Sequence, residues 1–303
     1  MRKDIVIQKN DAGQRLDKFL LKAFPALPPA LLYKAVRKKD IKRNGKRAES
    51  SDRLEAGDCL SVFLPEDILA PKPPHYSFLT AKKELRIVYE DDNILIVDKP
   101  AGILSHSERE GDMDTLIDRV LCHLYQTGNY RPEEEQSFAP ALCNRIDRNT
   151  RGLLLAAKTA ESLRILNEKI KAREIKKTYL CVCHGRFQEQ EGMLTGYLLK
   201  RPEDNQVAIF DRPVPGGKSI RTGYRVLREK GGLSLLEIDL LTGRTHQIRA
   251  HLAAAGHPLL GDGKYGRLRE DKRYGVRHQA LCSYALNFAF VTDAGILSYL
   301  QGR

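Results

Sequence analysis

The chain has 303 residues, enough for one large domain or two smaller ones. Hydrophobic residues make up 42% of it and charged residues 30%, a composition that excludes a fibrous or mostly disordered chain. The 51 Lys and Arg against 39 Asp and Glu give a net charge of +12, which indicates a polyanionic partner, with nucleic acid first and an anionic membrane surface second.

Targeting and metal signals are missing from the sequence. Residues 1–7 precede no long apolar stretch, and no window approaches about 18 consecutive apolar residues, so we expect neither a signal peptide nor a membrane-spanning helix. The six cysteines are scattered without a C-x-x-C pair, so we expect reduced thiols and a cytoplasmic location. His246 and His251 are five residues apart, roughly 140° around a helix, and cannot share an ion. We therefore expect no metal and no cofactor.

Residues 1–75 are predicted to form a separate small α/β domain. Apolar residues at helical spacing from Arg15, and again after Pro28-Pro29, predict two short helices. Asn44-Gly45 within 41–48 predicts a hairpin, and 58–65 predicts a strand. Eight basic residues lie between Lys34 and Arg47 against one acidic residue, which predicts a phosphate-binding surface, with a merely solvated face as the alternative. The candidate contacts are Lys34, Arg37, Lys38, Lys42 and Arg43.

A linker with three prolines is predicted at about 68–80, followed by one large domain over 81–303. Apolar runs of strand type occur in this domain without a regular helix after each one. They cover 87–89, 94–97, 153–157, 179–182 and 235–240. The pattern predicts an α+β fold with a mixed, largely antiparallel sheet.

Four polar clusters interrupt these runs, at 98–102, 144–152, 177–182 and 241–252. In the second, Asp147 lies among three arginines and should stay ionised, which suits a nucleophile or an electrostatic stabiliser better than a general acid. A surface salt bridge is the alternative. In the third, Tyr179, Cys181 and Cys183 should share one face of a strand. Tyr179 is then either a stacking platform for a base or a core tyrosine.

The fourth cluster predicts a helix that Thr245 caps and Gly256 ends. His246 and Arg249 would then lie in its first turn on one face, where free N–H groups favour an anion.

Two family resemblances follow from these residues. Residues 13–66 resemble the S-four-type RNA-binding domain in Arg15-Leu16-Asp17, Asn44-Gly45, Leu54 and Gly57-Asp58. The four clusters in this order resemble the RluA-type pseudouridine synthases, most specifically in Thr242-Gly243-Arg244-Thr245-His246-Gln247-Ile248-Arg249.

The second resemblance implies isomerisation of uridine in RNA to pseudouridine without a cofactor. It implies that Asp147 is the essential aspartate and that Arg145 helps to flip the target nucleotide. It also implies that Tyr179 stacks on the base and assists proton removal, and that Arg249 pairs with Asp147, with His246 a substrate contact beside it. Whether Asp147 attacks the sugar or removes a sugar proton stays open.

We expect large-subunit ribosomal RNA as the substrate, with transfer RNA as the alternative, and a monomeric protein without a membrane or small-molecule partner. Asn144 and Arg151 stand where the family usually has His and Ser, and Leu281-Cys282-Ser283 replaces a common Leu-His-Ala. Asn144 and Arg151 motivate a second hypothesis, a non-catalytic RNA-binding factor in ribosome assembly. A third is a glycosidase that releases uracil, although no second carboxylate is apparent.

Overall fold

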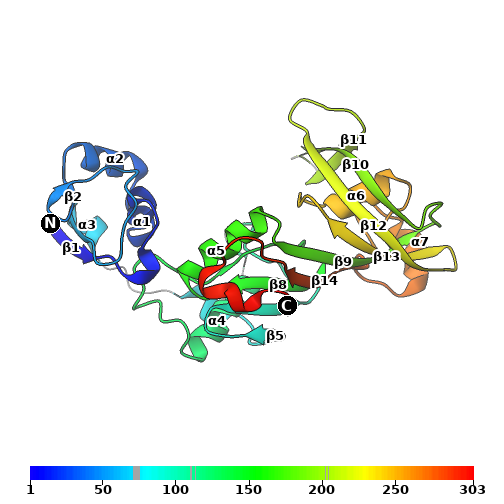
Figure 1. Cartoon of the computed structure of the whole chain (residues 1–303), viewed down its shortest axis with the longest axis horizontal. Coiled ribbons are helices and arrows are strands. Elements are labelled where there is room, and N and C mark those ends of the chain that lie inside the picture. Colours follow the sequence, from blue (N-terminus) through cyan, green and yellow to red (C-terminus); the bar gives the residue numbers. More distant parts are fainter. Residues whose placement is uncertain (71–75, 110, 113, 202, 204) are drawn as a thin grey trace.

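The computed structural model describes residues 1–70, 76–109, 111–112, 114–201, 203 and 205–303. The N-terminal part lies at one end of the molecule, apart from the large sheet (Figure 1). Its four strands pair in the order β1-β4-β2-β3. Leu16, Phe19 and Leu20 of α1 are fully buried in its core. The elements are β1(Arg2–Val6), η1(Lys9–Asp11), α1(Leu16–Ala23), α2(Pro29–Arg37), β2(Ile41–Arg43), β3(Lys46–Arg47), β4(Cys59–Phe63) and α3(Glu66–Leu69). The predicted helices, hairpin and strand are confirmed.

The linker predicted at 68–80 falls partly on residues 71–75, which lie outside the described residues. On one side, α3 contributes buried Ile68 and Leu69 to the N-terminal core. On the other, the 3-10 helix η2(Ser77–Thr80) buries Phe78 against the core of the large part. The described ends of this segment are therefore helical and packed, and its boundaries as a linker stay a prediction.

A sheet of ten strands, within the described residues, forms the large part of the molecule. The order is β11-β10-β12-β13-β9-β14-β8-β6-β5, with β7 paired to β8, and β14–β8 is the parallel pair among antiparallel ones. This confirms the α+β fold and its mixed, largely antiparallel sheet. The strands are β5(Ile87–Glu90), β6(Ile94–Lys99), β7(Ala141–Leu142), β8(Arg151–Ala157), β9(Ile175–His184), β10(Glu191–Arg201), β11(Gln206–Phe210), β12(Lys218–Lys230), β13(Leu233–Leu240) and β14(Leu281–Phe288).

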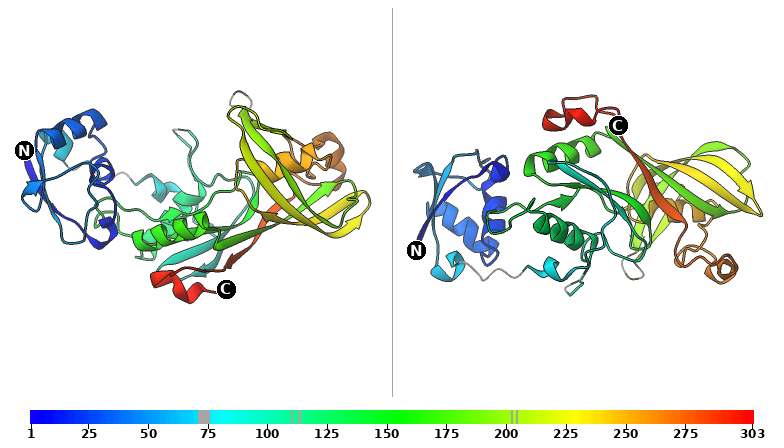
Figure 2. Two further views of the ribbon diagram at one scale, coloured as in Figure 1. Left: turned by 45° about the horizontal axis from the view of Figure 1, so that its top comes forward. Right: turned by 90° about the horizontal axis from the view of Figure 1, so that it is seen from below.

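Helices pack beside this sheet (Figure 2). They are α4(Leu116–Gln126), α5(Ala160–Lys171), α6(Gln247–Ala254), α7(Leu268–Asp271), η3(Lys272–Tyr274) and η4(Gly295–Leu300). In the described ranges, no helix has both the length and the apolar character needed to cross a bilayer.

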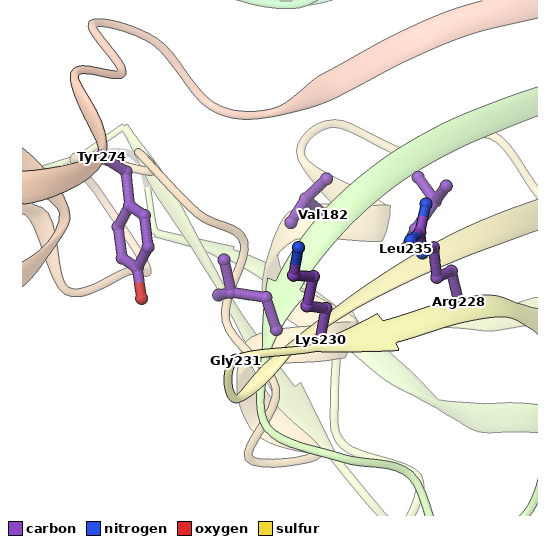
Figure 3. A pocket seen from close by; sticks show the side chains of 7 residues that line it. Val182, Arg228, Lys230, Gly231, Leu235 and Tyr274 are labelled. Carbon is purple, nitrogen blue, oxygen red and sulfur yellow. The ribbon is translucent and has the colours of Figure 1, made fainter.

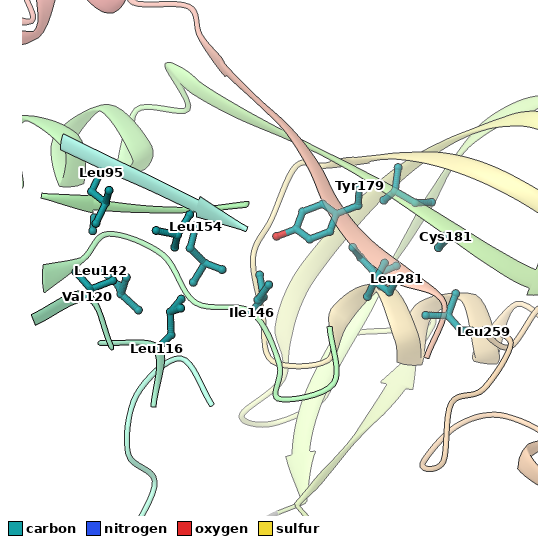
Figure 4. Close-up of a cluster of buried hydrophobic side chains, with 14 of the residues drawn as sticks. Leu95, Leu116, Val120, Leu142, Ile146, Leu154, Tyr179, Cys181, Leu259 and Leu281 are labelled. Carbon is teal, nitrogen blue, oxygen red and sulfur yellow. The ribbon is translucent and has the colours of Figure 1, made fainter. Parts of the chain in front are cut away.

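The main core runs between the two halves of the sheet (Figure 4). Leu95 and Leu154 belong to the β6–β8 half, while Tyr179 and Cys181 belong to β9 in the other half. As predicted from alternation, Tyr179, Cys181 and Cys183 are buried on one face of β9.

Gly152 allows the two halves to join. A side chain at this position would collide with the backbone of Ser283 on β14, and the φ of Gly152 is +115°, a conformation that favours glycine. The glycine that ends the 144–152 cluster therefore lets β8 run directly beside β14.

Hydrogen bonds tie the N-terminal part to the loop that precedes β7. Ser137 Oγ donates to Asp11 Oδ1, and Asn10 Nδ2 donates to Glu135 Oε1 at 2.7 Å. Asp11 is fully buried, and its Oδ2 has no partner among the described residues. A carboxyl group is therefore enclosed at this contact without a cation bonded to it.

Candidate active site

A cavity of about 960 Å³ opens where the two halves of the sheet meet. The loop before β8, strand β9 and the start of α6 line it. The predicted residues that it brings together are Arg145, Asp147, Tyr179, His246 and Arg249. A second hollow of about 450 Å³ has Arg228, Lys230 and Tyr274 as its ionisable residues (Figure 3). Because no carboxylate lines that hollow, the first cavity is the candidate site for chemistry.

One carboxylate oxygen of Asp147 is hydrogen-bonded, and the other has no hydrogen-bond partner among the described residues. Its Oδ2 accepts a hydrogen bond from Arg249 Nη1 at 2.9 Å. Its Oδ1 accepts none from the described residues, and the side chain is 25% exposed. A carboxylate with one unoccupied oxygen in a cavity is equipped to attack a carbon atom or to accept a proton.

Arg249 is held from behind by Asp262, a residue whose function the sequence did not indicate. Arg249 Nε and Nη2 donate to Asp262 Oδ2 and Oδ1 at 2.7 and 2.9 Å, and Asp262 is fully buried. Burial opposes ionisation of both groups, but their mutual bonds outweigh it, so the pKa of Arg249 is raised and that of Asp262 lowered. The guanidinium is thus fixed between two carboxylates, and it presents a single N–H to Asp147.

The helix start differs from the prediction. His246, not Thr245, takes the N-cap position of α6, with φ +55° and no side-chain cap. Its ring Nδ1 lies 2.9 Å from the Tyr265 hydroxyl, and Nε2 lies 3.9 Å from Asp147 Oδ2. Burial lowers the pKa of His246, so the ring is neutral at neutral pH. Because His246 is the N-cap residue, the prediction that it lies in the first turn is wrong as well, whereas Arg249 does lie in the first turn and the helix ends just before Gly256.

Tyr179 enters the cavity from β9 (Figure 4). Burial, with a smaller contribution from the charge of Asp147, raises the pKa of its phenol to about 12. The hydroxyl therefore stays protonated at neutral pH. It is suited to donate a hydrogen bond while the ring offers an apolar face.

Lys99 holds the loop that carries Asp147. Its ammonium, which is fully buried, donates to the carbonyl oxygens of Pro100, Ile103 and Arg148 at 2.8–2.9 Å. Burial lowers the pKa of Lys99 to about 8. The 98–102 cluster thus contributes by fixing the backbone directly after Asp147.

The predicted RNA contacts lie in two places. Arg145 is exposed on the wall of the cavity. Lys34, Arg37, Lys38 and Lys42 are exposed on α2 and β2, outside the cavity. Arg43 differs from the others, since its Nε donates to Asp58 at 2.7 Å. Its contact with RNA stays a prediction, as do the others.

Asn144 has a structural partner at the start of the loop. Its Oδ1 accepts from the backbone N–H of Leu155 at 3.0 Å, which ties the loop to β8. Arg151 is exposed, and its guanidinium lies 3.9 Å from Asp98.

Comparisons with known proteins define the class. The family described as RNA pseudouridylate synthase matches residues 93–254, and the S4 domain family matches residues 14–59. The chain is 33% identical over 298 residues to ribosomal large subunit pseudouridine synthase C of Vibrio cholerae serotype O1, covering 96% of this chain and 89% of that protein. It is 32% identical over 269 residues to ribosomal large subunit pseudouridine synthase D of Nitrosomonas europaea, covering 88% of this chain and 73% of that protein.

A solved structure agrees with the fold. Human RNA pseudouridylate synthase domain containing 1 superposes with a TM-score of 0.55 at 22% identity, over 74% of this chain and 83% of that chain. The protein is therefore an isomerase that acts on RNA. The chain belongs to the RNA pseudouridylate synthase family, within its RluA-type branch.

Proposed function

We propose that this enzyme converts uridine to pseudouridine in large-subunit ribosomal RNA, with Asp147 as the essential carboxylate acting on a nucleotide flipped into the cavity. The observation that carries the proposal is the hydrogen bonding of Asp147. Its Oδ2 accepts from Arg249, and its Oδ1 has no partner among the described residues and is available in the cavity. The ribosomal target is supported by the names of the relatives, synthases C and D of the large ribosomal subunit.

The reaction breaks the bond from base N1 to sugar C1′ and forms one from base C5 to C1′, and the C5 proton is lost to solvent. Asp147 can start it in two ways. Its Oδ1 can bond to C1′ to give an ester, or it can take the C2′ proton to give a glycal. In both routes the carboxylate becomes neutral and the N1–C1′ electron pair leaves with the base.

A base inside a helix cannot reach such a cavity, so the nucleotide must turn out of its stack at a cost of a few kcal/mol. Stacking on an aromatic ring returns about 1–3 kcal/mol per base. Tyr179 is the aromatic side chain that lines the cavity. Arg145 is exposed on the wall of the cavity. It is the candidate to fill the space that the flipped base leaves in the RNA or to bind the phosphate of that nucleotide.

The test is tritium release from RNA labelled at C5 of uridine, without added cofactor, comparing wild type with Asp147→Asn. Ribosomal and transfer RNA are supplied separately. Release from large-subunit ribosomal RNA by the wild type alone is the expected result. Release from transfer RNA only would replace the substrate, and release by Asp147→Asn at the wild-type rate would overturn the role of Asp147. Free uracil among the products would instead indicate a glycosidase.

A further inference from the structure

Lys177 is a partly buried cation in the wall of the cavity. It lies on β9 two residues before Tyr179, so both side chains point to the same face of the strand. Both line the cavity that holds Asp147. The ammonium makes no hydrogen bond or ion pair with the residues that the structure describes.

Three lysines that are buried in the described structure differ from Lys177, because each donates hydrogen bonds to acceptors of the protein. Lys158 donates to Glu90 at 2.9 Å, and Lys169 donates to Glu174 at 2.8 Å. Lys99 has three carbonyl oxygens. Taking a charge out of water without a partner is costly, and these three lysines, which are buried more fully than Lys177, all have acceptors.

Among the described residues, no carboxylate bonds to Lys177. The titratable group that acts on its charge is the thiol of Cys143, whose pKa burial raises to about 12, so the thiol stays neutral. Burial lowers the pKa of Lys177 in consequence. A cation held in a cavity wall without an anion is complementary to a negative charge that arrives with the substrate or forms on it.

The proposed reaction forms such a charge. When N1–C1′ breaks, Asp147 loses its negative charge to an ester or to a proton, and the detached uracil gains it, spread over N1 and the carbonyl oxygens. Arg249 cannot move toward the negative charge on the base, because Asp262 fixes the Arg249 guanidinium from the other side. A second cation is needed where the base lies.

We propose that Lys177 is a further catalytic residue whose ammonium contacts a carbonyl oxygen of the flipped uracil and stabilises the detached uracil anion. The inference rests on the proposed function, since it needs a uracil in this cavity. The N1–C1′ electron pair moves onto the base, and Lys177 keeps its proton throughout. The pair on C5 then forms the new bond to C1′ while the ester bond to Asp147 breaks or, in the glycal route, while C2′ takes its proton back from Asp147. The C5 proton is then lost to solvent.

The test compares Lys177→Met, Lys177→Gln and Lys177→Arg in the full-length enzyme. The matched control is Lys176→Met, because Lys176 is the exposed neighbour on the opposite face of β9. The measurements are the single-turnover rate of tritium release at saturating enzyme and the Kd for the same RNA. We expect both neutral variants to lose about 100-fold in rate, with a Kd within about twofold of wild type. Lys177→Arg should keep its rate within about tenfold, and Lys176→Met should match wild type.

Three results would overturn the inference. Neutral variants that turn over at the wild-type rate would remove Lys177 from the chemistry while leaving the proposed function standing. A loss in Kd with a normal rate at saturation would make Lys177 a phosphate contact. A Lys177→Arg enzyme as slow as the neutral variants would show that the shape of the side chain, and not its charge, matters.

Two neutral variants of different polarity guard against a result that comes from a single misfolded variant. A wild-type enzyme that releases no tritium from either RNA would instead overturn the proposed function, and this inference with it.

Discussion

Replacing Asp262 by Asn tests whether the buried anchor of Arg249 positions the chemistry. Asp262 Oδ2 accepts from Arg249 Nε, while Oδ1 accepts from Arg249 Nη2 and from the backbone N–H groups of Lys264 and Tyr265. The carboxamide has one acceptor oxygen. Placed with that oxygen at the Oδ1 position, it turns an NH₂ group toward Nε–H, so two donors face each other in a fully buried site.

The stability cost follows from burial. Removing one partner of a buried ion pair costs about 3–5 kcal/mol, and Arg249 keeps Asp147, so the lower end of about 3 kcal/mol applies. At about 2–4 °C per kcal/mol for a domain of roughly this size, the Tm of the catalytic domain should fall by about 6–12 °C. Glu237→Gln is the control, since Glu237 meets Arg225 at the same 2.7 Å but on the surface, where a pair contributes about 0–1 kcal/mol.

In the Asp262→Asn variant, the loss of catalytic rate should be larger than the loss of stability explains. Without its anchor, Arg249 has Asp147 as its remaining carboxylate and can turn to cover both oxygens of it, including the open Oδ1. We expect the single-turnover rate at a temperature well below the Tm to drop about 100-fold, with the Kd for RNA unchanged. An Asp262→Asn enzyme with the wild-type Tm and rate would refute this account of the anchor.

Three further predictions concern other parts of the chain. Asp147→Asn should abolish tritium release but keep RNA affinity, since phosphate contacts supply most of that affinity; a large loss in Kd would contradict this. Lys34→Ala with Lys38→Ala should lower the slope of log K against log salt by about 1.4–1.8, measured by filter binding, and an unchanged slope would move the RNA surface elsewhere. Burial raises the pKa of Asp11, so its contribution to stability is present at acid pH and lost as pH rises through the raised pKa. Asp11→Asn should therefore raise the Tm at about pH 8 relative to wild type but not at about pH 4, and a difference that does not vary with pH would contradict the assignment.

Periodicity and turn residues predicted most of the strands but not their full lengths. The apolar run at 179–182 marks only part of β9, which begins at Ile175. Two lysines and a threonine hid the beginning of this strand. Of these, Lys177 is polar on the face that lines the cavity, while Lys176 and Thr178 lie on the opposite face. Hydrophobic periodicity predicts a strand least reliably where the side chains of that strand line a functional cavity instead of the core.

The sequence indicated residues that the structure brings together in the cavity, but not the residues that support them. Asp147, Tyr179 and Arg249 could be named because each lies in a polar cluster and because the order of the clusters resembles the RluA-type pseudouridine synthases. Asp262 did not stand out, because its role depends on a guanidinium 13 positions earlier that the fold brings back to it. Thr245 was a reasonable cap by residue type, but His246 takes the N-cap position with a left-handed backbone and a ring bonded to Tyr265, which spacing does not reveal.

Affinity and chemistry are assigned to different cations in this protein. Lys34, Lys38 and Lys42 are exposed and form no ion pair with the described residues, so they are available to phosphates and sensitive to salt. Arg249 is bonded to two carboxylates, Asp147 and Asp262, which already balance its charge. Lys177, inside the cavity and without a carboxylate, fits neither group. A cation that is partly buried in the cavity wall and bonds to no carboxylate of the described residues meets a negative charge when the base is in place, which is why its removal should alter the rate and not the affinity.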